Sequence, residues 1–431
     1  MAFSAYPYDF PALAFPISNC TRLPPHHITL KLFSTATERD TLQIPEIVII
    51  GAGLSGLRTA TLLAEAGQDA VILEGASHLG GRIVSLDAIP SRAALSGASG
   101  RVDMGPAWVW PSMQPRMRRL LSHLGVTAYK QQASGDTLLE RSVLSPPQRV
   151  ATYTQEPPSF RVAGGMATVV ERLVAQLSPG QIYLDRRVVR VESGDDAVTV
   201  HALSANGSVT TICCRRLVIA LPPRLAAESV TFSPALPPPV EQAMRQTPTW
   251  MAGQAKYVAV YSRPFWRDAG LSGAARSAIG PLVEIHDASI PDGAAALFGF
   301  VGLTAAQRQA AGAAWESAAL AQLVRLFGVE AGNPVAVHVK DWAQSPLTAT
   351  AQDWPPLNAH PHYAALPESG SVWRDRLVWA GTETASDHGG YLEGALEAAE
   401  RAVAALASNA ASSHRPDARL HSGCGKGHHH T

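Results

Sequence analysis

Residues 46–56 read Glu-Ile-Val-Ile-Ile-Gly-Ala-Gly-Leu-Ser-Gly, and they decide the fold of this 431-residue chain. A short apolar run leads directly into Gly51, Gly53 and Gly56, and an apolar pattern of helical period follows. In a strand–turn–helix unit the first glycine allows the tight turn and the second lets a pyrophosphate approach the backbone. The third lets the helix lie close to the sheet. Because the free N–H groups of such a helix attract phosphate, the sequence predicts a dinucleotide-binding βαβ unit over roughly 44–82.

The second strand of this unit is predicted over residues 69–73 and ends in Glu74. A βαβ unit presents a ribose-binding acid at about this distance from its glycines. The next residues read Gly75-Ala76-Ser77-His78-Leu79-Gly80-Gly81-Arg82. Glycines permit a close backbone approach, and a guanidinium offers a planar fork of donors to a phosphate. A surface turn with a solvated arginine is the alternative interpretation.

The composition excludes several classes of function. Lysine plus arginine and aspartate plus glutamate number 35 each, which gives no electrostatic reason to expect nucleic acid or an anionic membrane as a partner. The four cysteines lack a zinc spacing, and the three histidines near the C-terminus are expected to form a solvated end, so no metal site is predicted. No apolar run reaches the length of a membrane span. We therefore expect a soluble, cytoplasmic protein, although the N-terminal residues leave a transit peptide open.

Further motifs carry a resemblance to a known family. After the first glycine loop come Leu-Gly-Gly-Arg, the pair Gly164-Gly165 before a helix, Val-Ile-Ala-Leu-Pro-Pro, Pro-Phe-Trp-Arg, and Ala-Gly-Thr-Glu-Thr-Ala followed by Gly-Gly-Tyr-Leu-Glu-Gly-Ala. Over about 45–407 the chain resembles the flavin-dependent amine oxidase superfamily, which includes monoamine oxidases, polyamine oxidases and L-amino-acid oxidases. The resemblance implies an α/β fold: an FAD-binding, Rossmann-like domain of the hydroxybenzoate-hydroxylase type, interleaved with a mixed-sheet α+β substrate domain.

The expected domains alternate along the chain, because strands and helices succeed one another without a clean break. We expect a disordered extension over 1–43, FAD-binding segments at 44–127, 164–245 and 345–408, substrate-domain segments at 128–163 and 246–344, and a disordered tail over 409–431.

The resemblance implies a set of cofactor-binding residues. Val188 matches a valine whose backbone is read by the adenine, although an ordinary core strand residue would look the same. Glu383 matches an acid that holds the ribityl chain or pyrophosphate-bound solvent, and a buried glutamate needs such a partner. The helix that begins near Tyr391 would aim its N-terminus at the flavin edge where negative charge accumulates. The full expected set is Gly51, Gly53, Leu54, Ser55, Gly56, Glu74, Gly80, Gly81, Arg82, Val188, Gly381, Glu383, Gly390 and Tyr391.

Lys256 and Tyr391 are the catalytic residues that the resemblance implies. Lys256 stands eight positions before Pro264-Phe265-Trp266, where the family lysine reaches flavin N5 through a water molecule. Burial of a lysine is costly, so we expect this side chain to be partly deprotonated or hydrated. A solvent-facing strand position is the alternative. Tyr391 matches one wall of the aromatic cage that aligns the amine.

The chain departs from the family at the second wall of this cage. Gln352 falls on the position of the second aromatic ring, and Trp354 or Trp108 would have to complete the cage. Ala351 stands where mitochondrial enzymes attach FAD through a cysteine, so we expect non-covalent FAD. Trp108 also stands where L-amino-acid oxidases tend to carry a carboxylate-binding arginine. We therefore expect neutral-tailed amines to be preferred, unless an arginine such as Arg92 or Arg101 restores that contact.

The leading hypothesis is an FAD-dependent oxidase of small-molecule amines. The carbon next to the amine nitrogen would be oxidised to an imine, and O2 would reoxidise the flavin to give H2O2. One alternative is a flavin-dependent desaturase or oxidative tailoring enzyme of secondary metabolism, which the altered cage favours. Another is a non-catalytic flavoprotein that serves as an interaction module. A homodimer stays open, and the sequence does not identify the substrate.

Overall fold

The computed structural model describes residues 45–90, 100–152, 156–357, 359–374 and 376–413. The expected extension over 1–43 lies outside these residues. The closing helix α9 (Leu392–Ser413) continues further than the sequence indicated, so residues 409–413 are helical and do not belong to the predicted tail. The rest of that tail lies outside the described residues.

A parallel five-stranded sheet forms the first half of the molecule, in the order β20-β13-β1-β2-β9. The glycine loop follows its central strand, as the βαβ pattern predicts. Its strands come from well-separated parts of the chain, so this domain is assembled from several segments. They are β1 (Ile47–Ile50), β2 (Ala70–Leu73), β9 (Ile182–Tyr183), β13 (Arg216–Ile219) and β20 (Leu377–Trp379).

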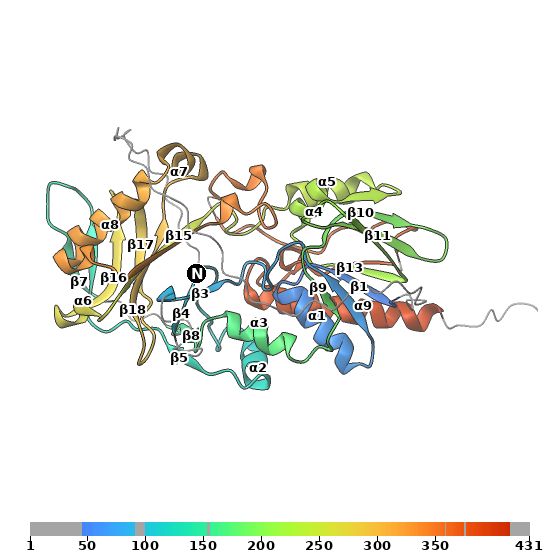
Figure 1. Cartoon of the computed structure of the whole chain (residues 1–431), viewed down its shortest axis with the longest axis horizontal. Coiled ribbons are helices and arrows are strands. Elements are labelled where there is room, and N and C mark those ends of the chain that lie inside the picture. Colours follow the sequence, from blue (N-terminus) through green and yellow to red (C-terminus); the bar gives the residue numbers. More distant parts are fainter. Residues whose placement is uncertain (1–44, 91–99, 153–155, 358, 375, 414–431) are drawn as a thin grey trace, which may run out of the picture.

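The central strand is buried on both faces, which explains its uninterrupted apolar sequence. Ile47 and Ile49 pack against α1 (Leu54–Glu65) and α9, which lie side by side (Figure 1). Val48 and Ile50 pack against a second, four-stranded sheet. That sheet contains β10 (Arg187–Ser193), β11 (Val198–Leu203), β12 (Val209–Cys214) and β14 (Thr231–Ser233).

A seven-stranded mixed sheet forms the other half, in the order β19-β15-β18-β17-β16-β6-β7 (Figure 1). Most of its strands are antiparallel, and β16 pairs with β6 in parallel. Together with the parallel sheet it confirms the predicted interleaved fold class. Its strands are β6 (Asp136–Glu140), β7 (Gln148–Ala151), β15 (Ala255–Tyr261), β16 (Leu271–Ser277), β17 (Leu282–Asp287), β18 (Ala295–Val301) and β19 (Ala336–Asp341).

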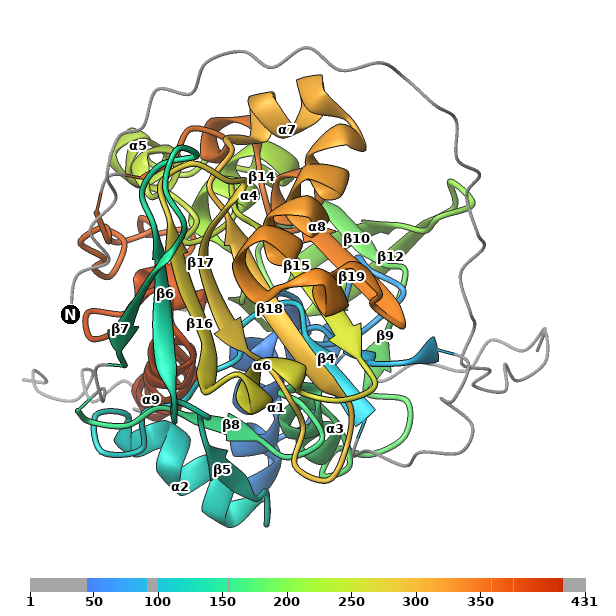
Figure 2. The same cartoon turned by 90° about the vertical axis from the view of Figure 1, so that its left-hand side faces the viewer.

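Strand β15 divides its side chains between the two faces of this sheet, as the period of two requires. Tyr257 and Ala259 pack on the outer face beneath α8 (Ala314–Phe327), which Figure 2 shows lying across the strands. Val258 and Val260 pack on the inner face, against Val102 at β4 (Arg101–Asp103). Lys256 has the parity of the inner set, so the alternation directs it towards the first half of the molecule.

Short elements connect the two halves. Helix α7 (Ala305–Ala311) ends at Gly312, whose φ of 54° separates it from α8. The remaining elements are β3 (Ser85–Asp87), α2 (Pro115–His123), β5 (Ala128–Lys130), β8 (Phe160–Val162), α3 (Ala167–Val174), α4 (Pro223–Ser229), α5 (Pro238–Gln246), α6 (Phe265–Asp268), and short 3-10 turns at Val329–Gly332, Trp342–Gln344, Ala351–Asp353 and Thr382–Thr384.

The described residues contain neither a bilayer-spanning helix nor a cluster of metal-binding side chains. None of the helices described is both long enough and apolar enough to cross a bilayer. Within the same residues, no group of three or more histidine, cysteine, aspartate or glutamate side chains could hold a metal ion.

The glycine loop yields a stability prediction. A Cβ atom on Gly56 would lie 1.9 Å from the Gly51 carbonyl oxygen, so Gly56→Ala must push α1 away from β1. We expect a loss of about 3 kcal/mol or more in the free energy of unfolding. The matched control is Gly53→Ala, whose Cβ would meet only the Gly80 oxygen at 4.0 Å and should cost about 1 kcal/mol or less. Urea denaturation of the flavin-free chain measures both, and equal losses would contradict the assignment of Gly56 to packing.

Candidate cofactor and substrate site

Glu74 is fixed at the end of β2 by two backbone amides. The Ala52 N–H donates to its Oε2 at 2.7 Å, and the Ala76 N–H donates to its Oε1 at 2.8 Å. The carboxylate is buried and keeps free lone pairs on both oxygens. It therefore lies beside the glycine loop in a geometry that suits acceptance of hydrogen bonds from a ribose.

The loop around Gly53 leaves room for a phosphate. Gly53 and Gly80 form an isolated parallel bridge, and a Cβ on Gly81 would approach the Gly53 Cα to 3.3 Å. Helix α1 begins here with no side-chain cap and no acidic residue in its first turn. Small residues and uncapped helix amides are what an anionic pyrophosphate requires. The residues present thus fit the dinucleotide that the sequence predicts.

Three other members of the predicted set have structural partners. The Ser55 hydroxyl donates to the Ala380 carbonyl and so ties α1 to the segment after β20. Val188 is buried between the parallel and four-stranded sheets. Leu54 packs in the core beneath α1. These contacts give each residue a role in packing, and their backbone groups remain the candidates for cofactor contact.

Arg82 and Glu383 form a bidentate ion pair. Nη1 of Arg82 lies 2.6 Å from Oε1 of Glu383, and Nη2 lies 3.1 Å from Oε2. Glu383 is 1% exposed. Burial acts to lower the pKa of Arg82, but the Glu383 carboxylate outweighs it and the net pKa is raised. The two residues that the resemblance assigned separately to the cofactor therefore hold each other in this structure, and Arg82 also donates to the Trp250 carbonyl at 3.3 Å.

Lys256 is buried and points into the space between the two halves of the molecule. Its Nζ donates to the carbonyls of Asp103 at 3.1 Å and Gly105 at 2.6 Å, and lies 4.7 Å from the centre of the Phe298 ring. Burial, more than any other influence, lowers the pKa of Lys256 to about 7. A solvent-facing position is excluded, since the side chain is 4% exposed.

A buried pair of opposite charges accompanies Lys256. The Asp103 carboxylate accepts from the Ser85 hydroxyl and the Met166 N–H, and its Oδ2 lies 3.7 Å from Nη2 of Arg161. The Asp103 charge raises the pKa of Lys256, whereas the Arg161 charge lowers it. Among the described residues, Nε and Nη1 of Arg161 find no hydrogen-bond partner although both atoms are buried. This leaves two donors beside the lysine.

Four rings gather at the start of α9, and we call Trp250, His360, Tyr363 and Tyr391 the aromatic cluster. Tyr391 and His360 are stacked, with ring centres 4.8 Å apart and planes at 9°. The Tyr391 position follows from the backbone before it: Gly390 has φ of 80°, and a Cβ there would lie 2.7 Å from the Trp250 Cβ. Gly389 is similarly close to Tyr363. Large side chains therefore pack directly on the glycine pair.

The expected substrate-lining residues lie in different places. The ring that faces Tyr391 is His360, not Gln352. The Gln352 side chain is exposed and Trp354 is half-buried. Trp108 belongs to another group of rings, where it contacts Trp110, His286, Phe298 and Phe300 and donates to Gln131. Phe298 connects Trp108 to Lys256, so Trp108 lies on the lysine side of the site.

Arg92 and Arg101 are the arginines that the sequence offered as carboxylate partners near Trp108. Arg92 lies outside the described residues. Arg101 pairs with Glu171 and donates to the Thr168 hydroxyl, on the surface of α3. The arginine that does approach this group of rings is Arg161, whose guanidinium carbon lies 5.9 Å from the Phe298 ring centre.

Sequence reasoning missed His360, Trp250, Asp103 and Arg161. His360 lies in the stretch Asn-Ala-His-Pro-His-Tyr, which carries no periodic pattern. Arg161 alternates with apolar residues in a short strand, like many surface arginines. Only the packing of distant segments shows that these side chains are buried together, although a charged residue inside an apolar strand was a usable signal for Arg161.

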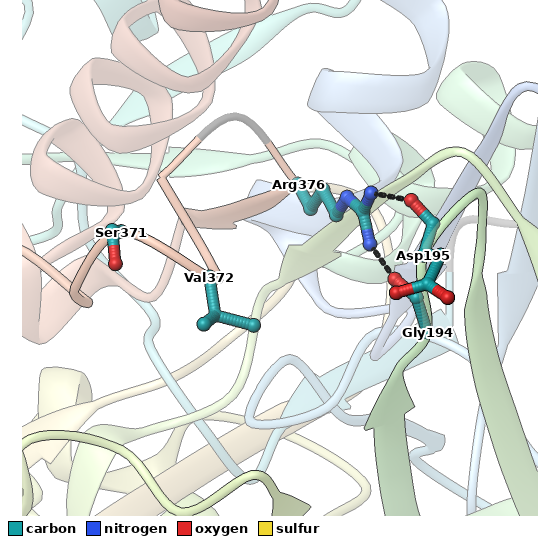
Figure 3. A pocket seen from close by; sticks show the side chains of 5 residues that line it. All are labelled: Gly194, Asp195, Ser371, Val372 and Arg376. Carbon is teal, nitrogen blue, oxygen red and sulfur yellow. Dashed lines mark hydrogen bonds between the residues drawn. The ribbon is translucent and has the colours of Figure 1, made fainter.

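A surface hollow of about 300 Å³ lies elsewhere, between the β10–β11 turn and the segment before β20. Figure 3 shows Arg376 donating to the carbonyls of Gly194 and Asp195 there. None of its lining residues belongs to the glycine loop, the lysine group or the aromatic cluster.

Comparisons with known proteins agree with this geometry. The family model described as flavin containing amine oxidoreductase matches residues 132–407, and that of an NAD(P)-binding Rossmann-like domain matches 49–124. The chain is 29% identical over 253 residues to a probable flavin-containing monoamine oxidase A of Dictyostelium discoideum, covering 56% of this chain and 52% of that protein. It is 31% identical over 268 residues to the flavin-containing amine oxidase B of Sus scrofa, covering 59% and 48%. These matches span about half the length of either relative.

Solved structures show the same fold. Cyclohexylamine oxidase from Brevibacterium oxydans has a TM-score of 0.69 at 21% identity, covering 86% of this chain and all of that one. A putrescine oxidase bound to putrescine has a TM-score of 0.67 at 20% identity, covering 84% and 99%. The family match covers more than half of the sequence, and the fold accords with it. The chain belongs to the flavin containing amine oxidoreductase family.

Proposed function

We propose that this protein is an FAD-dependent oxidase of small amines. The amine loses two electrons and two protons, one from the carbon next to nitrogen and one from the nitrogen, to give an imine that water hydrolyses. O2 takes up the two electrons and two protons to give H2O2. The observation that carries the proposal is a buried lysine of lowered pKa that donates to Gly105, a residue packed on the backbone of Arg82 at the end of the glycine-rich extension, in a chain of this family. The names of the relatives, which include monoamine oxidases, support amines as the substrate class.

FAD supplies the two-electron acceptor, and the protein binds and orients the reactants. The glycine loop and α1 would hold the pyrophosphate, and Glu74 would accept from the ribose. The Arg82–Glu383 pair fixes the turn before α9. That turn sets the position of Tyr391, which presents an apolar face to the substrate.

Lys256 holds or releases a proton at Nζ, close to the reacting centre. With its pKa lowered to about 7, the amine is partly neutral near physiological pH. A neutral Nζ can accept a proton or hold a water molecule, which an ordinary surface lysine does poorly. The carbonyls of Asp103 and Gly105 orient it from one side.

The test is anaerobic mixing of the flavin-loaded protein with matched pairs, each an amine and its α-carboxylated parent, such as phenethylamine and L-phenylalanine. We expect the amine to bleach the flavin absorbance about tenfold to a hundredfold more efficiently than the amino acid. Trp108 stands where an arginine would bind the carboxylate, and the charge-assisted hydrogen bonds missing there would contribute ~1.5–3 kcal/mol. A preference for the carboxylated member of each pair would overturn the amine proposal. If the Arg161→Met variant then lacks that preference, Arg161 is the partner of the carboxylate.

The other hypotheses have their own outcomes in the same experiment. Bleaching by none of the amines or amino acids, in protein that binds FAD, would favour the desaturase or tailoring reaction. A protein that cannot be loaded with FAD at all would favour the interaction module.

We predict that the FAD is bound without a covalent bond. Ala351 offers no thiol where the linkage forms in the mitochondrial enzymes, and its side chain is exposed at a 3-10 turn. Acid precipitation should release all of the yellow colour into the supernatant. Flavin that remains with the pellet after repeated washing would contradict the prediction.

The low pKa of Lys256 predicts a pH-dependent stability. An unfolded lysine titrates near 10.4, whereas burial lowers the pKa of Lys256 to about 7. The cost of burying its charge is therefore fully present below about pH 7 and is relieved as the pH rises towards about 10.4. Lys256→Met should raise the free energy of unfolding more at pH 6.5 than at pH 10.

Urea denaturation at the two pH values measures this difference. The matched control is Lys130→Met, which removes the same charge from an exposed strand position. If the difference in the free energy of unfolding between Lys256→Met and wild type is the same at both pH values, the buried lysine is not titrating as described.

A further inference from the structure

Tyr391 is the ring that the family resemblance assigns to the substrate cage, and one of its faces is covered by an imidazole of the same chain. The His360 ring lies parallel to it, with centres 4.8 Å apart. Its Nε2 lies 3.0 Å from the Gly389 carbonyl, on the residue pair that precedes Tyr391. The imidazole is thus held both by stacking and by a hydrogen bond.

The rest of the aromatic cluster encloses the same imidazole. Trp250 contacts it edge-to-face at 4.6 Å and 65°, and Tyr363 does so at 5.5 Å and 83°. Trp250 also lies 6.0 Å from Tyr391. Three aromatic rings around one half-buried histidine form a site suited to a flat or cationic group, since ring faces attract positive charge.

Resting on the proposed function, we propose that His360 is a specificity-determining residue of the amine site: it occupies the substrate face of Tyr391 as a neutral ring, and an amine binds by displacing it. A spacing of 4.8 Å leaves no room for another group between the two rings, because stacked groups need about 3.5–4 Å on each side. Displacement breaks the bond to the Gly389 carbonyl.

Protonation of His360 would favour the arrangement in which its ring covers Tyr391. An imidazolium binds the faces of Tyr391 and Trp250 more tightly than a neutral ring does, and it repels an incoming ammonium group. Burial, the largest influence, lowers the pKa of His360, and the charge of His388 lowers it further, while the carbonyls of Gly389 and Pro361 oppose them. The imidazole is therefore neutral at pH 7. The protonated ring, which should stay on Tyr391 and hinder an incoming amine, should appear only below the ordinary histidine pKa of about 6.5.

The other ionisable groups near the cluster leave this balance to His360. Burial raises the pKa of both Tyr363 and Tyr391, so neither phenol carries charge at neutral pH. Arg82 with Glu383, and Arg224 with Asp353, lie close as compensated ion pairs. Lys256, whose pKa burial lowers to about 7, also changes its charge in this range, so the pH dependence that belongs to His360 is the part that the His360 variants abolish.

The experiment measures binding of cumylamine to the full-length, flavin-loaded protein by calorimetry between pH 5 and 8. This aromatic amine has no hydrogen on the carbon next to nitrogen, so it can bind without being oxidised. In wild type we expect the dissociation constant to rise about tenfold per pH unit below the pKa of His360, because one proton competes with one amine.

Variants assign the effect. His360→Phe and His360→Gln remove the titrating ring, and the glutamine can still donate to the Gly389 carbonyl, so both should bind with no rise below pH 6.5. His362→Phe, at an exposed position two residues away, is the matched control and should retain the wild-type slope. A flat wild-type profile, or a wild-type slope in both His360 variants, overturns the inference.

The outcome is separable from that of the proposed function. If cumylamine binding depends on pH through His360 but no amine bleaches the flavin, the oxidase proposal fails and the role of His360 stands. If amines bleach the flavin and His360→Phe binds cumylamine with the wild-type pH profile, only the inference about His360 fails.

Discussion

The site depends on the buried ion pair between Arg82 and Glu383. Arg82 ends the glycine-rich extension after β2, and Glu383 lies in the turn before α9, some three hundred residues later. The pair also reaches the segment before β15, because Arg82 donates to the Trp250 carbonyl. A carboxylate that is 1% exposed would be costly to bury alone, so the folded state requires all of these segments to meet in one register. The glycine loop, the aromatic cluster and the strand of Lys256 are positioned by this contact.

Close backbone packing extends the same constraint to Lys256. A Cβ on Gly105 would lie 1.9 Å from the Arg82 carbonyl oxygen, so the segment after β4 lies directly against the arginine backbone. The Gly105 carbonyl then accepts from Nζ of Lys256 at 2.6 Å. Burial at this position accounts for most of the lowered pKa of the lysine. The lowered pKa of Lys256 thus follows from the way the two halves of the molecule pack together.

The sequence predicted those features that depend on local chemistry. The spacing of Gly51, Gly53 and Gly56 predicted the βαβ unit. The alternating pattern of β15 predicted a strand, and only the face of the sheet on which Lys256 lies had to come from the structure. It did not indicate His360, because a histidine between prolines has no periodic neighbours and its stacking on Tyr391 is a contact between separate segments. Gln352, which the resemblance aligned with the second ring of the cage, is exposed, and the ring that stacks on Tyr391 comes from a later loop. Side-chain partners across sheets are set by packing that no single stretch encodes.

The interleaving of the two halves has a consequence for how the chain acquires its structure. The parallel sheet places β20 beside β13, and α9 beside α1, so its edge strand and covering helix both come from the end of the chain. During synthesis, β1 and α1 emerge early and must wait for almost all of the remaining sequence before their apolar surfaces are covered. Such non-local contacts slow folding and prolong the exposure of unpaired strand edges. The strands of each large sheet are separated along the chain by segments of the other half, so the chain is expected to fold as a single unit, with the C-terminal helix completing it.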